Sequence, residues 1–167
     1  MQDKDETTRL DALDKAMVEY NAGDTRRIDH AHKVTAYAKE LREKEGGDYL
    51  IVVAAGLLHD IGIHQAEAKH GSASGKFQEI EGPPIAREIM TKLNFTLAQI
   101  DEVCAIVGNH HSPCKINTVN FKCLYDADWL VNLHDDFNIT DKHKLAGIID
   151  SVLLTASGKT RAREIYL

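Results

Sequence analysis

No apolar run in this sequence is long enough to cross a membrane. The longest, residues 50–58, contains nine apolar or small residues, whereas a membrane-spanning helix needs about 20. The first ten residues are acidic and polar and contain no apolar signal region or targeting segment. We therefore expect a cytoplasmic protein that does not associate with membranes.

The sequence also lacks an excess of positive charge and a set of paired cysteines. It contains 20 Lys and Arg against 26 Asp and Glu, a formal net charge of −6. This balance argues against a general nucleic-acid binder, but it allows a small anionic substrate held by a metal ion. Cys104, Cys114 and Cys123 are odd in number and their spacing fits no zinc motif, so we expect reduced thiols.

Strand-like alternation, internal repeats and low-complexity linkers are absent as well. The apolar spacing predicts an all-α protein, a compact bundle of six or seven helices. The length of 167 residues fits a single globular domain, in which residues 1–23 form an N-terminal helix packed on a core of residues 24–167. Helices are expected over residues 6–21, 24–45, 48–61, 83–93, 97–108, 120–133 and from 141 onward, the last with a break at Gly158. Pro83 and Pro84 suit the first turn of the helix over residues 83–93. Residues 62–80 are expected to form a polar loop.

Histidine, in contrast, is abundant, with nine residues in the chain. His59 and Asp60 directly follow the apolar run of residues 50–58. A helix that is apolar all round must be covered on every side, and an ionised Asp is costly to bury without a partner. A metal ion would accept both side chains, so His59 and Asp60 are candidate metal ligands.

Helical phase separates the histidines of residues 24–45. His30 lies four residues before Val34, at the edge of the apolar stripe, whereas His32 lies roughly on the opposite side. His30 is therefore either a core histidine with a hydrogen-bond partner or a metal ligand, and His32 is expected to face solvent.

Two later helices place further candidates on apolar faces. His110 and His111 extend the buried face of residues 97–108 at its C-terminal end, where helix capping and metal binding are both open interpretations. Asp128 lies on the apolar stripe of the next helix and needs a partner, while Asp126 points roughly the other way.

His30, His59, Asp60 and Asp128 together offer two imidazoles and two carboxylates. A mixed nitrogen and oxygen set suits a divalent ion such as Mn, Fe, Co, Ni or Mg better than a structural zinc. Four protein ligands leave two positions open in an octahedron, and a water bound there loses a proton near neutral pH to become a nucleophile.

The ordered pattern of His30, His59-Asp60 and Asp128 resembles the HD-domain superfamily of metal-dependent phosphohydrolases. The local sequences around these residues resemble it too, and the C-terminal segment is similar to the closing helix of small bacterial and archaeal members. These segments are RIDH (27–30), GLLHDIG (56–62), YDADWL (125–130) and LTASGK (154–159). The resemblance covers roughly residues 25 to 165.

The resemblance implies a helical HD domain with one metal ion held by His30, His59, Asp60 and Asp128. Asp60 and His59 are then also the catalytic residues. A metal-bound water or hydroxide would attack the phosphorus of a phosphate mono- or diester, such as a nucleotide or a small phosphorylated metabolite.

Some members of the superfamily bind a second metal ion, and His110 and His111 match the position of that second site. Such members have another histidine where this chain has residues 77–83, in which Glu79 or Glu81 could substitute. The sequence also has no Gly-Tyr-Pro after His111, which argues against a cyclic-dinucleotide diesterase.

Contacts to the substrate phosphate are less specified. Many two-metal members have a lysine three residues after the aspartate, but here Ile63 stands there, followed by His64. We name Arg27 and His64 as candidate phosphate ligands. The departures from the family pattern weigh against a two-metal diesterase.

Two other functions stay open at this point. Some HD-type proteins are di-iron oxygenases, which His110 and His111 permit but the missing histidine disfavours. A non-catalytic sensor module that binds a nucleotide is the other alternative. We expect a small phosphorylated substrate, no nucleic-acid partner, and a chain that can form a homo-oligomer.

Overall fold

The computed structural model describes residues 4–135 and 138–167. Within these ranges the chain forms nine α-helices and no strand, so the all-α prediction is confirmed, with more helices than the six or seven expected. The helices are α1 (Lys4–Tyr20), α2 (Thr25–Glu45), α3 (Tyr49–Leu58), α4 (Ile63–His70), α5 (Gly75–Lys92), α6 (Leu97–Val107), α7 (Val119–Asp135), α8 (Lys142–Val152) and α9 (Ala156–Tyr166).

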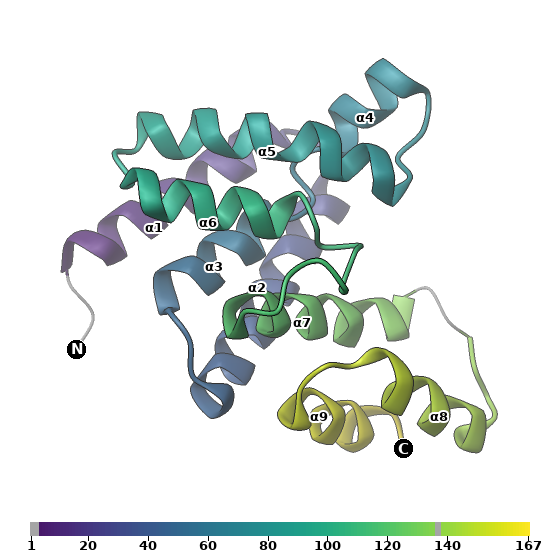
Figure 1. The fold of residues 1–167 in the computed structure, drawn as a ribbon. Coiled ribbons are helices and arrows are strands. Elements are labelled where there is room, and N and C mark those ends of the chain that lie inside the picture. The colour runs from purple at the N-terminus through teal and green to yellow at the C-terminus, as the bar shows by residue number, and fades with distance from the viewer. Residues whose placement is uncertain (1–3, 136–137) are drawn as a thin grey trace.

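The apolar helix α3 lies at the centre of the bundle. It contacts α1, α2, α6 and α7, and every residue from Leu50 to Leu58 is buried. Figure 1 shows α5 and α6 above it, α2 and α7 below it, and α8 and α9 at the far side of α7. By length and composition alone, the 22-residue stretch Tyr49–His70 could cross a membrane. It comprises both α3 and α4, however, and 78% of its most apolar part is buried inside the protein.

A close approach between α2 and α3 brings the first two site histidines together. A Cβ atom on Gly56 would lie 2.6 Å from Thr35 Oγ1, so only glycine permits this spacing. Thr35 is itself buried against Gly56 and donates its hydroxyl to Ala31 O within α2, so the hydroxyl is satisfied without a partner from α3. The two helix axes can therefore pack tightly one turn before His59.

Helix boundaries follow the expected capping residues in several places. Asp24 accepts a hydrogen bond from Arg27 N at the start of α2, and Thr96 forms a capping box with Gln99 at the start of α6. Gly46, with φ of 85°, ends α2 as expected. These local signals predict their helix ends because each pairs a backbone group within three or four residues.

The predicted loop over residues 62–80 is wrong. Residues 63–70 form α4, which ends at Gly71 in the left-handed conformation, and α5 already begins at Gly75. Pro83 and Pro84 consequently lie inside α5 and not in its first turn. The helix persists through them because its face carrying Gly82, Ala86 and Met90 is buried against neighbouring helices, and packing outweighs the local preference.

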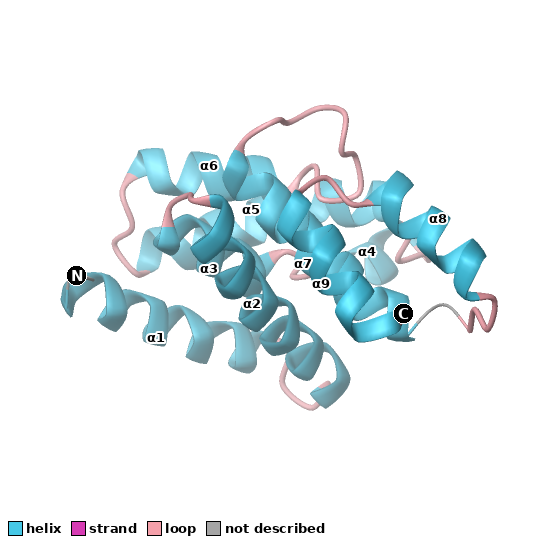
Figure 2. Ribbon diagram, turned by 90° about the horizontal axis from the view of Figure 1, so that it is seen from below, coloured by secondary structure: helices cyan, strands magenta, loops and turns pink. Residues whose placement is uncertain are grey.

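The predicted break at Gly158 is also wrong. The chain leaves its helical path at residues 153–155, and Thr155 caps α9 by accepting from Gly158 N. Gly158 lies inside α9, where a Cβ atom would come within 2.4 Å of Asp126 Oδ2. The glycine is needed for this close contact between α9 and α7, which lie together in the view of Figure 2, and not for a turn.

The N-terminal helix α1 covers one side of α3. Leu10, Leu13 and Met17 are its buried residues, and the contacts are with α3 and, more weakly, α5. The domain division at residues 23 and 24 stays a prediction, and residues 1–3 of the first segment lie outside the described residues.

Candidate metal centre

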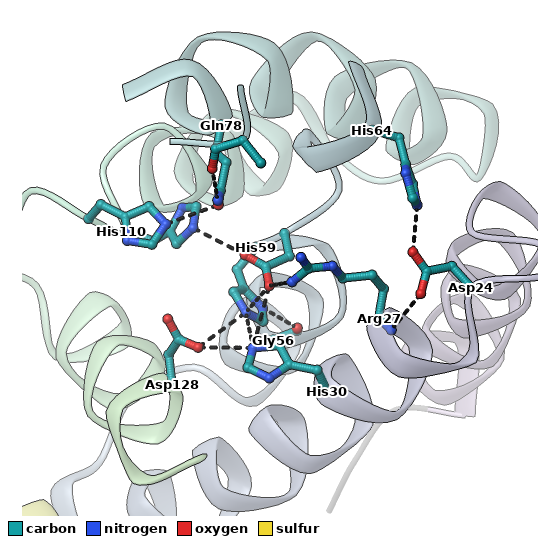
Figure 3. A network of polar contacts seen from close by, with 12 residues as sticks. Asp24, Arg27, His30, Gly56, His59, His64, Gln78, His110 and Asp128 are labelled. Carbon is teal, nitrogen blue, oxygen red and sulfur yellow. Dashed lines mark hydrogen bonds and ion pairs between the residues drawn. The ribbon is translucent and has the colours of Figure 1, made fainter. Parts of the chain in front are cut away.

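Histidine and aspartate side chains from four parts of the bundle meet at one point in the interior (Figure 3). His30 comes from α2, Asp128 from α7, and His59 and Asp60 from the turn after α3, while His110 follows the end of α6. His30 and Asp128 are 98 positions apart in the chain. The fold is therefore what assembles the centre.

The first group of donors surrounds His59 Nε2. This nitrogen lies 3.3 Å from His30 Nε2, 3.4 Å from Asp60 Oδ2 and 3.5 Å from Asp128 Oδ1. His30 Nε2 in turn lies 3.1 Å from Asp128 Oδ1 and 3.4 Å from Asp60 Oδ2. Neighbouring ligands of an octahedral ion with bonds of about 2.1 Å stand about 3 Å apart, so this spacing suits a divalent cation.

Asp60 lies between two groups of nitrogen donors. Its Oδ2 faces His30 and His59, and its Oδ1 lies 3.4 Å from His110 Nε2. Ligand atoms of Asp60, His110 and His111 all lie within 4.8 Å of one another, as do those of His30, His59 and Asp60. Each group could hold a metal ion, and the two would share Asp60.

Backbone carbonyls fix the orientation of two imidazoles. His59 Nδ1 lies 2.8 Å from Gly56 O, and His110 Nδ1 lies 2.7 Å from Val107 O. A carbonyl oxygen only accepts, so Nδ1 carries the hydrogen in both rings and Nε2 keeps its electron pair when the ring is neutral. Both Nε2 atoms therefore face the cluster as electron-pair donors, as metal-binding histidines do.

His110 provides an independent sign that the cluster fits a cation. Its Nε2 atom is buried and has no hydrogen-bond partner among the described residues, which is uncommon for a buried polar atom. The Asp60 carboxylate faces it, with Oδ1 at 3.4 Å, and an ionised carboxylate cannot donate a hydrogen bond. A cation is a partner that both groups accept.

The buried carboxylates and His59 shift one another's pKa values. Burial alone would lower the pKa of His59, but the negative charges of Asp60 and Asp128 outweigh it and raise this pKa well above 6.5. Burial would raise the pKa values of Asp60 and Asp128, yet His59 and its neighbours hold both below 3.8. Both carboxylates stay ionised, and the cluster therefore needs positive charge from protons or from a cation.

A cavity of about 440 Å³ between α2 and α7 opens onto the cluster. His30, Asp60 and Asp128 lie in its wall, and the remaining lining is mostly polar, including Arg26, Arg27, Lys33, Gln78, Asn132 and Asp135. The Arg27 guanidinium points towards Asp60, with Nη1 at 4.0 Å from Oδ2. Once a cation neutralises Asp60 and Asp128, the three cationic side chains of α2 suit this cavity to an anionic ligand.

Two of the residues singled out from the sequence lie in other contacts. His64 Nε2 lies 3.1 Å from Asp24 Oδ2, beside the cluster and not within it. Glu81 is buried, and its carboxylate lies 3.1 Å from Lys69 Nζ and 2.9 Å from His70 Nε2. To bind phosphate, His64 would have to leave Asp24, and to bind a second metal ion, Glu81 would have to leave Lys69 and His70.

Gln78 is a site residue that the sequence did not single out. Its Nε2 donates to Ala73 O at 2.7 Å, and its Oε1 lies 3.0 Å from His111 Nε2. His111 Nε2 is thus the donor, and its Nδ1 keeps the electron pair. The signal that could have revealed Gln78 is its place in residues 77–83, where two-metal relatives are expected to carry another histidine.

Two neighbouring polar residues are directed away from the cluster. His32 is exposed and its Nε2 lies 2.7 Å from Asp14 Oδ1, as its helical phase predicts. Asp126 points away from the metal centre as expected, but it is fully buried. It accepts hydrogen bonds from Leu154 N, Thr155 N and Thr155 Oγ1.

Fold and cluster together define an all-helical protein whose centre is suited to a divalent metal ion. The model of the HD domain family matches residues 27–133, and the chain belongs to this family. The resemblance recognised in the sequence is thereby confirmed.

Solved structures share the fold over most of the chain. A predicted HD superfamily hydrolase from an uncultured Thermotogales bacterium is 23% identical with a TM-score of 0.65, covering 96% of this chain and 84% of that one. Bacillus subtilis YpgQ, solved in complex with ADP, is 20% identical with a TM-score of 0.68, covering 96% of this chain and 88% of that one. No curated protein matches the sequence at a significant level.

Proposed function

We propose that this protein is a metal-dependent phosphohydrolase that acts on a nucleotide or a similar small phosphorylated metabolite. The observation that carries the proposal is the convergence of two imidazoles and two carboxylates at a cavity whose wall also includes Arg26, Arg27 and Lys33. Membership of the HD domain family supports a metal-dependent hydrolase. The complex of Bacillus subtilis YpgQ with ADP supports a nucleotide as the ligand class.

His30, His59, Asp60 and Asp128 would hold one divalent ion, such as Mn, Fe, Co, Ni or Mg. When bound, such an ion polarises a phosphoryl oxygen and lowers the pKa of a coordinated water, which makes that water a nucleophile at neutral pH. The hydrogen bond from His59 Nδ1 to Gly56 O keeps the imidazole turned towards the ion.

Arg27 is placed to hold the phosphate. Its guanidinium lines the cavity beside Asp60, and a planar guanidinium can bind two phosphate oxygens at once. In that position it also neutralises negative charge that develops on the phosphoryl group. We assign the phosphate contact to Arg27 ahead of His64, because His64 is already paired with Asp24.

A second group of donor atoms that shares Asp60 favours another candidate function. The group of Asp60, His110 and His111 would complete a two-metal site, and two iron ions there would fit a di-iron oxygenase. Oxygen uptake on reduction of the iron-loaded protein would support that alternative, and hydrolysis without oxygen uptake would exclude it.

Metal content per chain is the first test of the proposed function. The protein is purified without chelator or nickel affinity resin, and bound metals are measured by elemental mass spectrometry together with hydrolysis of a nucleotide panel. One divalent ion and release of phosphate or pyrophosphate are expected. His32→Ala serves as a control that keeps both, because His32 is exposed and pairs with Asp14 outside the cluster.

Other results have defined meanings. Two ions per chain would assign His110 and His111 as ligands. No metal after reconstitution with Mn, Fe, Co and Mg would contradict the enzyme, and nucleotide binding without turnover in every metal would favour the sensor module. A cytoplasmic location and homo-oligomer formation stay predictions from the sequence.

A further inference from the structure

A second cavity adjoins the one at the metal centre. Its volume is about 300 Å³, and it lies between α2, α7 and α9. Lys33 of α2 and Asp135 at the end of α7 line both cavities. The two cavities are therefore neighbours that share these two side chains in their walls.

The two cavities differ in chemistry. The first is lined mainly by charged and amide side chains. The second has His134 beside the two shared charged residues, and the rest of its wall is aromatic and aliphatic: Tyr37, Leu130, Val131, Ile165 and Tyr166. A ligand that occupied both would need a charged end and an apolar end.

The helices define the length of such a ligand. Along α2 the cavity residues follow in the order His30, Lys33 and Tyr37. Seven residues of helix correspond to about 10 Å. This distance is on the order of the length of one nucleoside 5′-monophosphate.

The aromatic walls of the second cavity are held in place before any ligand binds. The Tyr166 hydroxyl donates to Leu130 O. The Arg161 guanidinium lies 6.0 Å from the Tyr37 ring centroid and is anchored by Glu40 at 2.9 Å. A preformed aromatic surface loses little entropy when a flat ring packs against it.

We propose that this second cavity, the base pocket, binds the planar base of a nucleotide whose phosphate lies at the metal centre. The proposal rests on the proposed function and extends it by naming the residues that select the substrate. Tyr37 and Tyr166 provide aromatic surface for the ring, and Lys33 and Asp135 at the neck can donate to and accept from sugar hydroxyls. An alkyl chain would instead lay apolar groups against these two charged side chains.

The base pocket also gives the C-terminal helix a function. Ile165 and Tyr166 of α9 form its outer wall, and α9 is attached to α7 through the contact of Thr155 with Asp126. The helix that closes the chain thus becomes a determinant of substrate specificity. It touches neither the metal ligands nor Arg27 in the described contacts.

Binding of two matched ligands tests the base pocket. The ligands are phosphonate analogues of AMP and of ribose 5-phosphate, in which carbon replaces the ester oxygen so that neither is hydrolysed. Titration calorimetry with the Mn²⁺-loaded full-length protein gives both dissociation constants. We expect the AMP analogue to bind at least about tenfold more tightly, because base stacking on aromatic side chains supplies an effect of this order.

Variants assign the difference to the pocket. Tyr37→Ala should lower the affinity for the AMP analogue about tenfold and leave the affinity for the ribose analogue unchanged. Tyr37→Phe should keep both affinities. Ile165→Lys, at a position 36% exposed, tests the outer wall without disturbing the core, and Leu97→Lys, an equivalent change at the exposed surface of α6, is its matched control. If Tyr37→Ala does not fold, the Ile165→Lys result decides.

Three outcomes would overturn the base pocket: equal binding of the two analogues to the wild-type protein, equal losses for both in Tyr37→Ala or Ile165→Lys, and tighter binding of octylphosphonate than of the AMP analogue. Hydrolysis of nucleotides is measured separately. Selective binding of the AMP analogue without any hydrolysis would contradict the proposed function and support the base pocket. Nucleotide hydrolysis without selective binding would support the proposed function and contradict the base pocket.

Discussion

Asp126 and Asp128 stand two residues apart on α7, and both are buried, yet their surroundings are opposite in character. Asp128 faces the imidazoles of His30 and His59 at 3.1 and 3.5 Å. Asp126 faces backbone N–H groups and one hydroxyl, at distances of 2.6 to 2.8 Å, where residues 154 and 155 join α8 to α9. Two carboxylates of one helix thus serve two different regions of the molecule.

The pKa values of the two carboxyl groups record the difference. Burial raises the pKa of Asp126, and its hydrogen bonds to Thr155 and Leu154 offset this only in part. Burial acts on Asp128 in the same direction, but the charge of His59 and the contact with His30 reverse it and lower that pKa. Asp126 is thus held by three hydrogen bonds, whereas Asp128 lies among groups that can exchange a proton for a metal ion.

The largest expected effect comes from removing Asp128. Asp128→Ala should weaken binding of the divalent metal about 100-fold or more and abolish most hydrolysis, because loss of a direct ligand should cost at least as much as loss of an outer-shell partner. Metal affinity by competition with a chromogenic chelator measures it. Asp126→Ala is the matched control and should retain metal affinity; a comparable loss in both variants would mean that Asp128 acts through the fold alone.

The next largest effect is on the free energy of unfolding, and it concerns Asp126. Asp126→Ala leaves two backbone N–H groups and the Thr155 hydroxyl without their acceptor, which should lower the free energy of unfolding by about 3 kcal/mol. Urea denaturation of metal-free protein measures this value. Asp126→Asn keeps one carbonyl acceptor and should lose less, so equal losses in the two variants would argue against the hydrogen-bond explanation.

The smallest effect is the pH dependence of stability, where the two carboxyl groups should act with opposite signs. The raised native pKa of Asp126 means that its contribution is present below pH 3.8 and is lost as the pH rises through the native pKa. The lowered native pKa of Asp128 means that its contribution is present above pH 3.8 and is lost as the pH falls towards the native pKa.

Urea denaturation of the chelator-treated protein at several pH values tests these signs. Asp126→Asn should remove the loss of stability that occurs as the pH rises above 3.8. Asp128→Asn should remove the loss of stability that occurs as the pH falls below 3.8. If both variants removed the loss of stability on the same side of pH 3.8, the opposite signs assigned to Asp126 and Asp128 would be wrong.

The sequence alone determined the fold class and the family. Helical periodicity and caps such as Asp24 and Thr96 depend on residues within one or two turns, so they can be read along the chain. The same periodicity distinguished His30 from His32, because neighbours on one helix differ by a fixed angle. The ordered His and Asp pattern then predicted the HD domain, which the family model confirms.

The tertiary structure alone decided the features that depend on contacts between distant residues. Pro83 and Pro84 stay inside α5 because the helix is buried beside them, and Glu81 is paired with Lys69 and His70. Gln78 reaches His111 across 33 positions, and Asp126 joins α7 to the start of α9. Such pairings carry no local periodicity, since the energy that selects them is released only when the helices pack together.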